Sequence, residues 1–162
     1  MSTLGEISTA IDKIDTHKIL IKVLKQSNIQ NFIKDMIHDR IYSHGITGTG
    51  VKLKTDKAKS GHVYSTFTET IKESVGDPFN RVTLTDTGRM WDTLKILIKE
   101  HSFITELNLQ KGSDNVFDNF TNQFSSEKAF HDAVTSLSDN EMVMLIEEYI
   151  APNFMKILNE IL

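Results

Sequence analysis

The stretch KILIKEHSFITELNLQ, residues 95–110, indicates the fold class of this chain. From Phe103 onward, two sets of residues alternate with a period of two, the spacing at which a β-strand places successive side chains on opposite faces. His101 and Ser102 stand between this half and the apolar residues 96–98, where a turn would fall. We therefore predict a β-hairpin across residues 95–110. The alternating sets are Phe103, Thr105, Leu107 and Leu109 on one face, and Ile104, Glu106, Asn108 and Gln110 on the other.

A strand, a tight turn and a short helix are expected directly before the hairpin. Residues 81–85 have the β-branched content typical of a strand, and we expect this strand to join the same sheet. In the turn that follows, formed by Asp86, Thr87 and Gly88, Gly88 would let the backbone reverse tightly and Asp86 would cap the helix over residues 89–94. These three residues are expected to serve the fold rather than catalysis.

The first half of the chain has the apolar periodicity of helices. Its widest apolar stripe predicts a helix over residues 28–43, which Ser27 or Asn28 could cap. Gly45 suits the left-handed position that follows a helix end. Residues 1–27 are expected to form a helical extension, and residues 28–162 a single domain.

Helices are also predicted after residue 65, so that the expected fold class is α+β. A capping-box sequence beginning at Thr66 predicts a helix to about Val75, and another beginning at Ser138 predicts a terminal helix over residues 139–161. Residues 126–136 fit a helix between them. Pro152 should kink the terminal helix or break it in two.

Two loops carry the residues most suggestive of a ligand. Residues 45–50, GITGTG, hold three glycines, but their spacing matches neither a dinucleotide fingerprint nor a P-loop, so we expect a tight turn. The following loop is basic and has few apolar anchors. It could contact a neighbouring protein or, without sequence preference, the phosphates of DNA, and it could equally be a solvated loop. Its candidate contact residues are Lys52, Lys54, Lys57 and Lys59.

Composition and charge exclude several classes of protein. The chain has 162 residues, which is about one domain, and no cysteine, so disulfide scaffolds, thiol nucleophiles and thiolate metal sites are excluded. No apolar run approaches a membrane span, and the N-terminal sequence lacks the features of a secretory signal. The net charge is −4, made up of +1 in residues 1–50, +2 in 51–100 and −7 in 101–162. Such polarity suits contacts between proteins or between copies of one protein, and the acidic third could equally be a solvated helix face.

No motif for catalysis or for a cofactor is found. The six histidines include no pair four residues apart, and neither a zinc-protease motif nor a nucleophile elbow occurs. Neighbouring carboxylates such as Glu147 and Glu148 would point to different sides of a helix. Trp91 is expected to anchor the core rather than to form a ligand platform. We therefore expect no enzyme activity, no metal and no cofactor.

Five segments in fixed order carry a resemblance to a known family. The chain resembles the tail-completion and head–tail joining proteins of tailed bacteriophages, and more closely versions from phages of Bacteroidetes, which include the crAss-like group. The likeness covers about residues 28–162, and the ordered set of segments is what makes it specific. The family's first glycine motif usually has an acidic residue where this chain has Ile46-Thr47. The segments are DRIYSHGITGTGVKL (39–53), YS (64–65), VTLTDTGRMWDTLK (82–95), LSDNE (137–141) and IAP (150–152).

The resemblance implies a structural virion protein of the neck or connector, with no catalytic or cofactor residue. Such a subunit would form a ring of 12 or 6 copies between portal and tail, around the DNA channel. Its partners would be itself, the portal, adjacent neck or tail proteins and, without specificity, the packaged DNA, but no membrane. It would assemble in the bacterial cytoplasm and reside at the head–tail junction. The alternatives are a tail terminator or minor tail component and, from another class, a small regulatory or nucleic-acid-binding domain.

Overall fold

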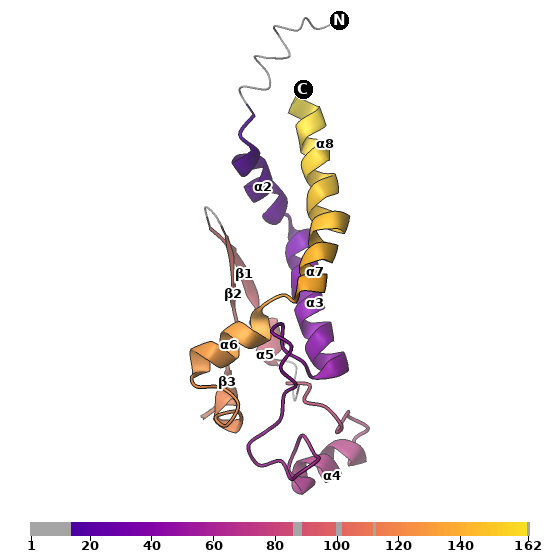
Figure 1. Ribbon diagram of the computed structural model, residues 1–162, viewed down its shortest axis with the longest axis vertical. Coiled ribbons are helices and arrows are strands. Elements are labelled where there is room, and N and C mark those ends of the chain that lie inside the picture. Colours follow the sequence, from indigo (N-terminus) through magenta and orange to yellow (C-terminus); the bar gives the residue numbers. More distant parts are fainter. Residues whose placement is uncertain (1–13, 86–88, 100–101, 112, 162) are drawn as a thin grey trace, which may run out of the picture.

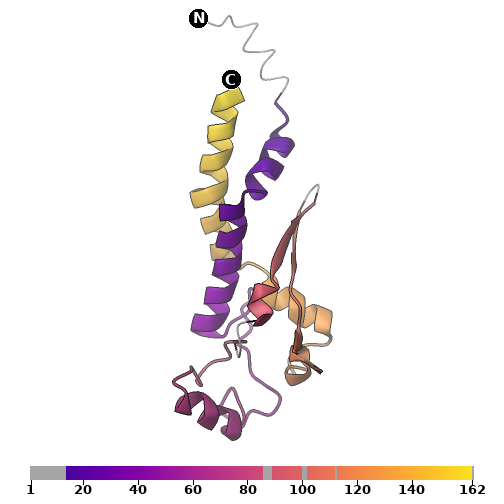
Figure 2. The same cartoon turned by 180° about the vertical axis from the view of Figure 1, so that it is seen from behind.

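The computed structural model describes residues 14–85, 89–99, 102–111 and 113–161 (Figure 1). Helices α2, α3 and the C-terminal helical rod run along the long axis, the β-hairpin and α6 stand beside them, and α4 lies at the lower end. Figure 2 shows the same arrangement from behind. In chain order the elements are α2 (Thr16–Leu24), α3 (Ser27–His44), α4 (Thr66–Ser74), α5 (Arg89–Asp92), β1 (Lys95–Ile98), β2 (Phe103–Glu106), β3 (Gln110–Lys111), β4 (Asp114–Asn115), the 3-10 helix η1 (Val116–Asn119), α6 (Glu127–Thr135), α7 (Asp139–Met144), the π-helix η2 (Leu145–Ile150) and α8 (Ala151–Ile161).

The mixed α+β class predicted from the hairpin is confirmed. Strands β1 and β2 pair antiparallel, with Lys95 opposite Glu106 and Ile98 opposite Phe103. The ladder is shorter than predicted, because the chain leaves it after Glu106 and forms a second small sheet from β3 and β4. The predicted alternation of burial nevertheless continues past the ladder, since Leu107 and Leu109 are buried whereas Asn108 and Gln110 are exposed.

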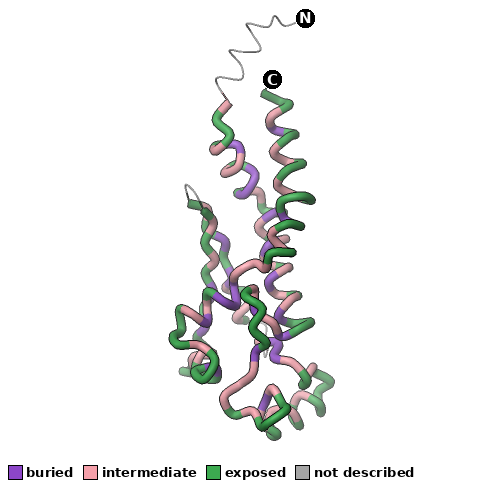
Figure 3. Tube along the Cα trace, viewed as in Figure 1, coloured by how far each residue is buried: buried purple, intermediate pink, exposed green. Residues whose placement is uncertain are grey.

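Helix α3 supplies the centre of the core. Ile29, Ile33, Ile37 and Ile41 follow one another at a spacing of four, and all four are fully buried. Helix α3 packs on α2, α6 and β1, so it connects the N-terminal helix with the hairpin and α6. Figure 3 shows buried stretches along α3 and the hairpin. Helix α2 contributes Ile19, Val23 and Leu24 to the same core.

A second group of packed side chains surrounds Phe130 on α6. The rings of Phe117, Phe120 and Phe124 lie 6.1, 4.9 and 5.3 Å from that of Phe130, measured between centroids. Phe117, Phe120 and Phe124 have helical spacing in the sequence, yet only residues 116–119 form a helix, the 3-10 helix η1. Turns complete the segment and bring all three rings to α6.

The glycine-rich segment forms the expected turn and docks on the end of α6. Gly45 closes α3 with φ +64°, as predicted. Gly48 meets a different requirement: an added Cβ would lie 2.2 Å from the carbonyl oxygen of Ser136. Its N–H donates to the carbonyl of Ala133 at 3.0 Å. Only glycine allows this approach of the two backbones.

A nearly buried ion pair fixes the same junction. The side chains of Arg40 and Glu141 are 9 % and 14 % exposed and form a direct ion pair. Arg40 also donates to the carbonyls of Val134, at 2.9 Å, and Ile46, at 3.1 Å. One guanidinium therefore joins α3, the glycine-rich turn, α6 and α7.

The C-terminal helix runs through Pro152 without separating into two helices. Its hydrogen-bond pattern changes from α to π over residues 145–150 and returns to α from Ala151 (Figure 1). Pro152 has no N–H to donate, and a π segment beside it shifts the pairing of the backbone groups. The break into two helices that the sequence allowed is therefore absent, and a π turn lies directly before Pro152 instead. The capping box of Ser138 and Glu141 is confirmed.

The strand predicted over residues 81–85 is wrong. Val82 and Thr83 are buried, but they belong to no strand, and Leu84 has a φ of +51° that ends any extended run. The N–H of Thr83 donates instead to the Tyr64 hydroxyl at 3.1 Å, and the Thr85 N–H donates to the Thr83 hydroxyl. Short polar side chains compete with a ladder in this way.

Two predicted caps are also wrong by one residue. The first residue before α3 is Gln26, which makes no capping hydrogen bond with its side chain. Helix α4 is capped by Ser65, whose hydroxyl accepts from the N–H of Thr68, and not by Thr66. The partner expected in that capping box, Glu69, pairs with His62 instead. The predicted turn of Asp86, Thr87 and Gly88 lies outside the described residues.

Candidate functional site

Helix α4 presents its apolar side to solvent. Phe67, Ile71 and Val75 follow one another at a spacing of four, and they are 76 %, 47 % and 67 % exposed. None of the helix's residues is buried, as Figure 3 shows at the lower end of the molecule. We call the surface formed by Phe67, Ile71 and Val75 the α4 face.

The polar side of α4 is the side that faces the molecule. The side chains of Glu69 and Lys72 are only 17 % and 13 % exposed. Lys72 lies over the ring of Tyr64, 5.4 Å from its centroid, and pairs with Asp77 at 3.7 Å. Glu69 pairs with His62 at 2.9 Å. Charges hold this helix in place, which is the reverse of the usual amphipathic arrangement.

The reversed orientation has an energetic consequence. Burying a fully exposed Val, Ile or Phe side chain stabilises a protein by about 1.5–3 kcal/mol. In the isolated chain, the outward orientation of α4 therefore leaves several kcal/mol of hydrophobic stabilisation unused. An apolar patch of this kind marks an interaction surface. Thr70 and Ser74 border the α4 face, and no Lys or Arg lies on it. Helices that bind membrane surfaces carry basic residues beside the apolar face, so the composition favours a protein partner.

The four candidate lysines lie in the loop next to α4. Lys52, Lys57 and Lys59 are exposed and Lys54 is half-buried. Within the described part of the chain, none of them forms an ion pair with a carboxylate. They therefore display positive charge along the segment that leads from the glycine-rich turn to α4.

The backbone of this loop is anchored, although its sequence has few apolar residues to hold it. The Lys54 N–H donates to the side-chain oxygen of Gln123 at 2.8 Å, and the Gln123 amide donates to the Lys52 carbonyl at 3.0 Å. Leu53 between them is fully buried. The lysine side chains are thus displayed from a fixed backbone.

Asp56 forms the second anchor of the loop. Its carboxylate accepts from the N–H and hydroxyl of Thr121, at 2.8 and 2.6 Å, and from the N–H of Asn122 at 3.0 Å. Burial raises the pKa of Asp56, but these three hydrogen bonds together outweigh it, so the pKa lies below 3.8. The ionised carboxylate is the form that closes the anchor.

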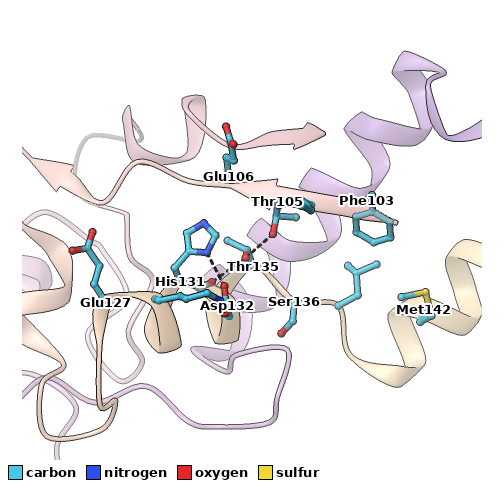
Figure 4. Close-up of a pocket in the computed structure, with 12 residues that line it drawn as sticks. Phe103, Thr105, Glu106, Glu127, His131, Asp132, Thr135, Ser136 and Met142 are labelled. Atoms are coloured by element: carbon cyan, nitrogen blue, oxygen red, sulfur yellow. Dashed lines mark hydrogen bonds and ion pairs between the residues drawn. The ribbon is translucent and has the colours of Figure 1, made fainter. Parts of the chain in front are cut away.

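A groove of about 1040 Å³ lies between β2 and α6, with His131 on one wall (Figure 4). The Nε2 atom of His131 accepts from the N–H of Leu107 at 3.2 Å, which leaves the proton on Nδ1, 3.3 Å from Asp132. The hydrogen bond from Lys128 is the largest influence on the pKa of Asp132 and lowers it. Nε2 therefore ties the residue that follows β2 to α6, whereas the partner of Nδ1 is the neighbouring residue on α6 itself. Thr105 strengthens this contact by donating to the Thr135 hydroxyl at 2.7 Å.

The remaining sequence candidates do not converge on one site. Trp91 is half-buried against the core, its ring lies 5.2 Å from that of His38 between centroids, and its N–H donates to the Thr85 hydroxyl. His62 belongs to the α4 anchor. Over the described ranges, no three His, Asp or Glu side chains are grouped so as to hold a metal ion. No described helix has the length and apolar character needed to cross a membrane.

Comparisons of the chain with protein-family models, with curated proteins and with solved structures found no match.

Sequence reasoning located the lysine loop but missed the α4 face. The signal was present, since Phe67, Ile71 and Val75 lie on one side of the helix predicted over residues 66–75. Periodicity identifies an apolar side without telling whether it faces inward. The deciding signal was the pairing of Glu69 and Lys72 with partners in the loop and turn on either side of the helix.

Proposed function

We propose that this chain is a structural subunit of the neck or connector of a tailed bacteriophage. Copies of it form a ring between portal and tail and help to join head to tail around the DNA channel. The observation that carries the proposal is the outward α4 face, because a subunit of an assembly keeps apolar surface for its neighbours. The resemblance of five ordered segments to those of head–tail joining proteins suggests the location.

Two of the shared segments meet in space, which supports treating them as one unit. Arg40 and Gly48 belong to the segment 39–53, and Glu141 belongs to the segment 137–141. The Arg40–Glu141 ion pair joins these segments, and Gly48 approaches Ser136, the residue directly before the second segment.

The anchored lysine loop suits a surface next to neighbouring proteins or to DNA. Lys57 and Lys59 are exposed in the loop that leads into α4, whereas Lys52 pairs with Ile46 at the glycine-rich turn. Contact with DNA through so few lysines would be weak and independent of sequence, which lets DNA slide. We assign the loop primarily to protein contact, because the chain as a whole carries a net charge of −4.

Particles of the virus that encodes the chain provide the test. Peptide mass spectrometry of purified particles should detect the chain, and disruption of its gene should yield filled heads and separate tails. Tails of irregular length, still joined to heads, would instead indicate a tail terminator. Absence of the chain from particles would overturn the proposal and favour a regulatory or nucleic-acid-binding domain.

A further inference from the structure

Strand β2 forms an open edge of the two-stranded sheet. The N–H of Lys99 donates to the Ser102 carbonyl at 2.7 Å, so these two residues form a hydrogen-bonded pair of the antiparallel ladder. Hydrogen-bonded and non-hydrogen-bonded pairs alternate along such a ladder. Phe103 and Thr105 therefore belong to the non-hydrogen-bonded pairs, and their backbone N–H and C=O groups point away from β1.

Helix α6 covers one end of this edge and leaves the rest open. Leu107 follows β2 directly, and by the same alternation its N–H lies on the same side as those of Phe103 and Thr105. It donates to Nε2 of His131 on α6 at 3.2 Å. Among the described residues, the outward backbone groups of Phe103 and Thr105 make no such hydrogen bond. Two donors and two acceptors are thus available along the edge.

The groove between β2 and α6 runs along this open edge. All four residues of β2 line it, although their side chains alternate between the two faces of the sheet. Figure 4 shows Thr105 directed toward Thr135 on α6 and Glu106 directed the other way. A space that meets both faces of a strand lies beside its backbone. The volume of about 1040 Å³ therefore adjoins the unpaired N–H and C=O groups.

We propose that an extended segment of another protein adds to β2 as a third strand, in the groove beside α6. An open strand edge recognises an extended backbone through main-chain hydrogen bonds, while the neighbouring pockets select its side chains. Antiparallel addition gives the more stable pairing. A two-stranded hairpin alone is marginally stable, so a third strand would also strengthen the sheet. This inference goes beyond the proposed function and does not depend on it.

The walls of the groove define the apolar side chains of the added strand. Phe103, Leu137 and Met142 are half-buried and line the groove, so an apolar side chain on the face toward α6 fits beside them. On the other face, the added strand would lie next to Ile104, which is 38 % exposed. A β-branched residue directly opposite Ile104 is the favourable cross-strand partner.

The charges of the groove favour a cation in the added strand. The charged side chains that line it, apart from histidine, are Glu106, Glu127, Asp132 and Lys128. Lys128 pairs with Asp132, which leaves two carboxylates, those of Glu106 and Glu127. Lys95 lies opposite Glu106 in the ladder, but in the described part of the chain no ion pair joins them. A Lys or Arg opposite Glu106 would supply the missing partner.

A second copy of this chain fits the edge less well than a different protein. If two β2 strands paired around a two-fold axis, the outward groups of Phe103 would meet those of Thr105. Ile104 would then lie opposite itself, and Glu106 directly opposite Ser102, so Glu106 would gain no cation there. The other described strands, β1, β3 and β4, are already paired within the chain. The occupant is therefore assigned to another protein.

A synthetic probe, acetyl-Lys-Thr-Val-Leu-Thr-amide, tests the inference by NMR on the full-length protein. In the antiparallel register its Lys lies opposite Glu106, its Val opposite Ile104 and its Leu opposite Phe103. We expect saturating probe to slow hydrogen exchange of the Phe103 and Thr105 amides by roughly tenfold or more. The Ile104 amide, which already belongs to the ladder, should change little.

Matched forms of the probe separate backbone pairing from apolar contact. N-methylation of its second and fourth residues removes the donors that face β2 and should weaken binding by roughly tenfold or more. N-methylation of the third and fifth residues, whose N–H groups face away, should leave binding unchanged.

Two variants of the protein make the same distinction. Thr105→Pro removes an outward N–H at an edge position where proline is tolerated, and it should abolish binding. Thr105→Val loses only the hydroxyl contact with Thr135 and should keep it. Circular dichroism of each variant verifies the fold.

Three results would overturn the inference. The first is unchanged exchange of the Phe103 and Thr105 amides at millimolar probe, and the second is equal binding of the two N-methylated probes. The third is slow exchange of both amides in the protein alone, together with a dimer in analytical ultracentrifugation, which would show that a second copy fills the edge. Because all three are measured on purified protein, they are separate from the neck assignment, which depends on finding the chain in particles.

Discussion

Removing Arg40 should destabilise the protein more than the loss of any single surface charge. In Arg40→Met, the Glu141 carboxylate keeps its burial but loses its counter-ion, and the carbonyls of Ile46 and Val134 lose a donor. Burial lowers the pKa of Arg40. The Glu141 carboxylate raises it, but burial has the larger effect, which shows that the guanidinium has lost much of its contact with water. Breaking one partner of a buried pair costs about 3–5 kcal/mol.

A matched variant separates the ion pair from the helix cap. Glu141→Gln keeps a residue that can complete the capping box with Ser138, because Gln serves at that position as Glu does. It leaves Arg40 with its two carbonyl partners, so we expect a smaller loss, about 1.5–3 kcal/mol. The double variant should lose less than the two single losses combined, by about 0.5–3 kcal/mol.

Urea unfolding followed by circular dichroism measures these losses. A chain of this size typically has 5–15 kcal/mol of stability in total, so Arg40→Met should shift the midpoint strongly. Its melting temperature should fall by about 6–20 °C. A loss below about 1 kcal/mol, the scale of an exposed pair, or strict additivity in the double variant would refute the role given to this ion pair.

Three further predictions concern the turn, the loop anchor and the lysines. Gly48→Ala places a Cβ 2.2 Å from the Ser136 carbonyl oxygen and should cost about 1–3 kcal/mol; an unchanged midpoint in urea unfolding would contradict the close-approach explanation. Because folding lowers the pKa of Asp56 from 3.8, its ionised form contributes stability above that pH, and the contribution is lost as pH falls through the lower folded value. The difference in melting temperature between wild type and Asp56→Asn should therefore shrink below about pH 4, and a constant difference would show that the carboxylate charge is irrelevant. Replacing all four loop lysines with Glu should leave the monomer folded, as surface substitutions usually do, but prevent joining of heads to tails; normal joining would refute the role of the loop, whose replaced residues are Lys52, Lys54, Lys57 and Lys59.

Elements with strong local signals were predictable from the sequence. The four isoleucines of α3 lie four residues apart, so they define one buried face in any tertiary arrangement. Gly45 and Ser138 mark helix ends through interactions with adjacent backbone, and both were identified. The hairpin followed from alternation alone.

The errors arose where distant residues decide the structure. Residues 81–85 have strand composition, but the Tyr64 hydroxyl takes the Thr83 N–H and the threonine hydroxyls bond locally. The lysine loop seemed unanchored because Gln123, which holds it, is 69 residues from Lys54. The orientation of α4 depends on Tyr64, His62 and Asp77, and local periodicity does not report on them.

A cryo-electron microscopy reconstruction of the particle neck tests the central proposal most directly. The expected map shows this chain in a ring of 6 or 12 copies between portal and tail, with Phe67, Ile71 and Val75 covered by protein. The opposite result is a neck whose rings are all built from other chains, or a ring of this chain in which the α4 face stands in open solvent.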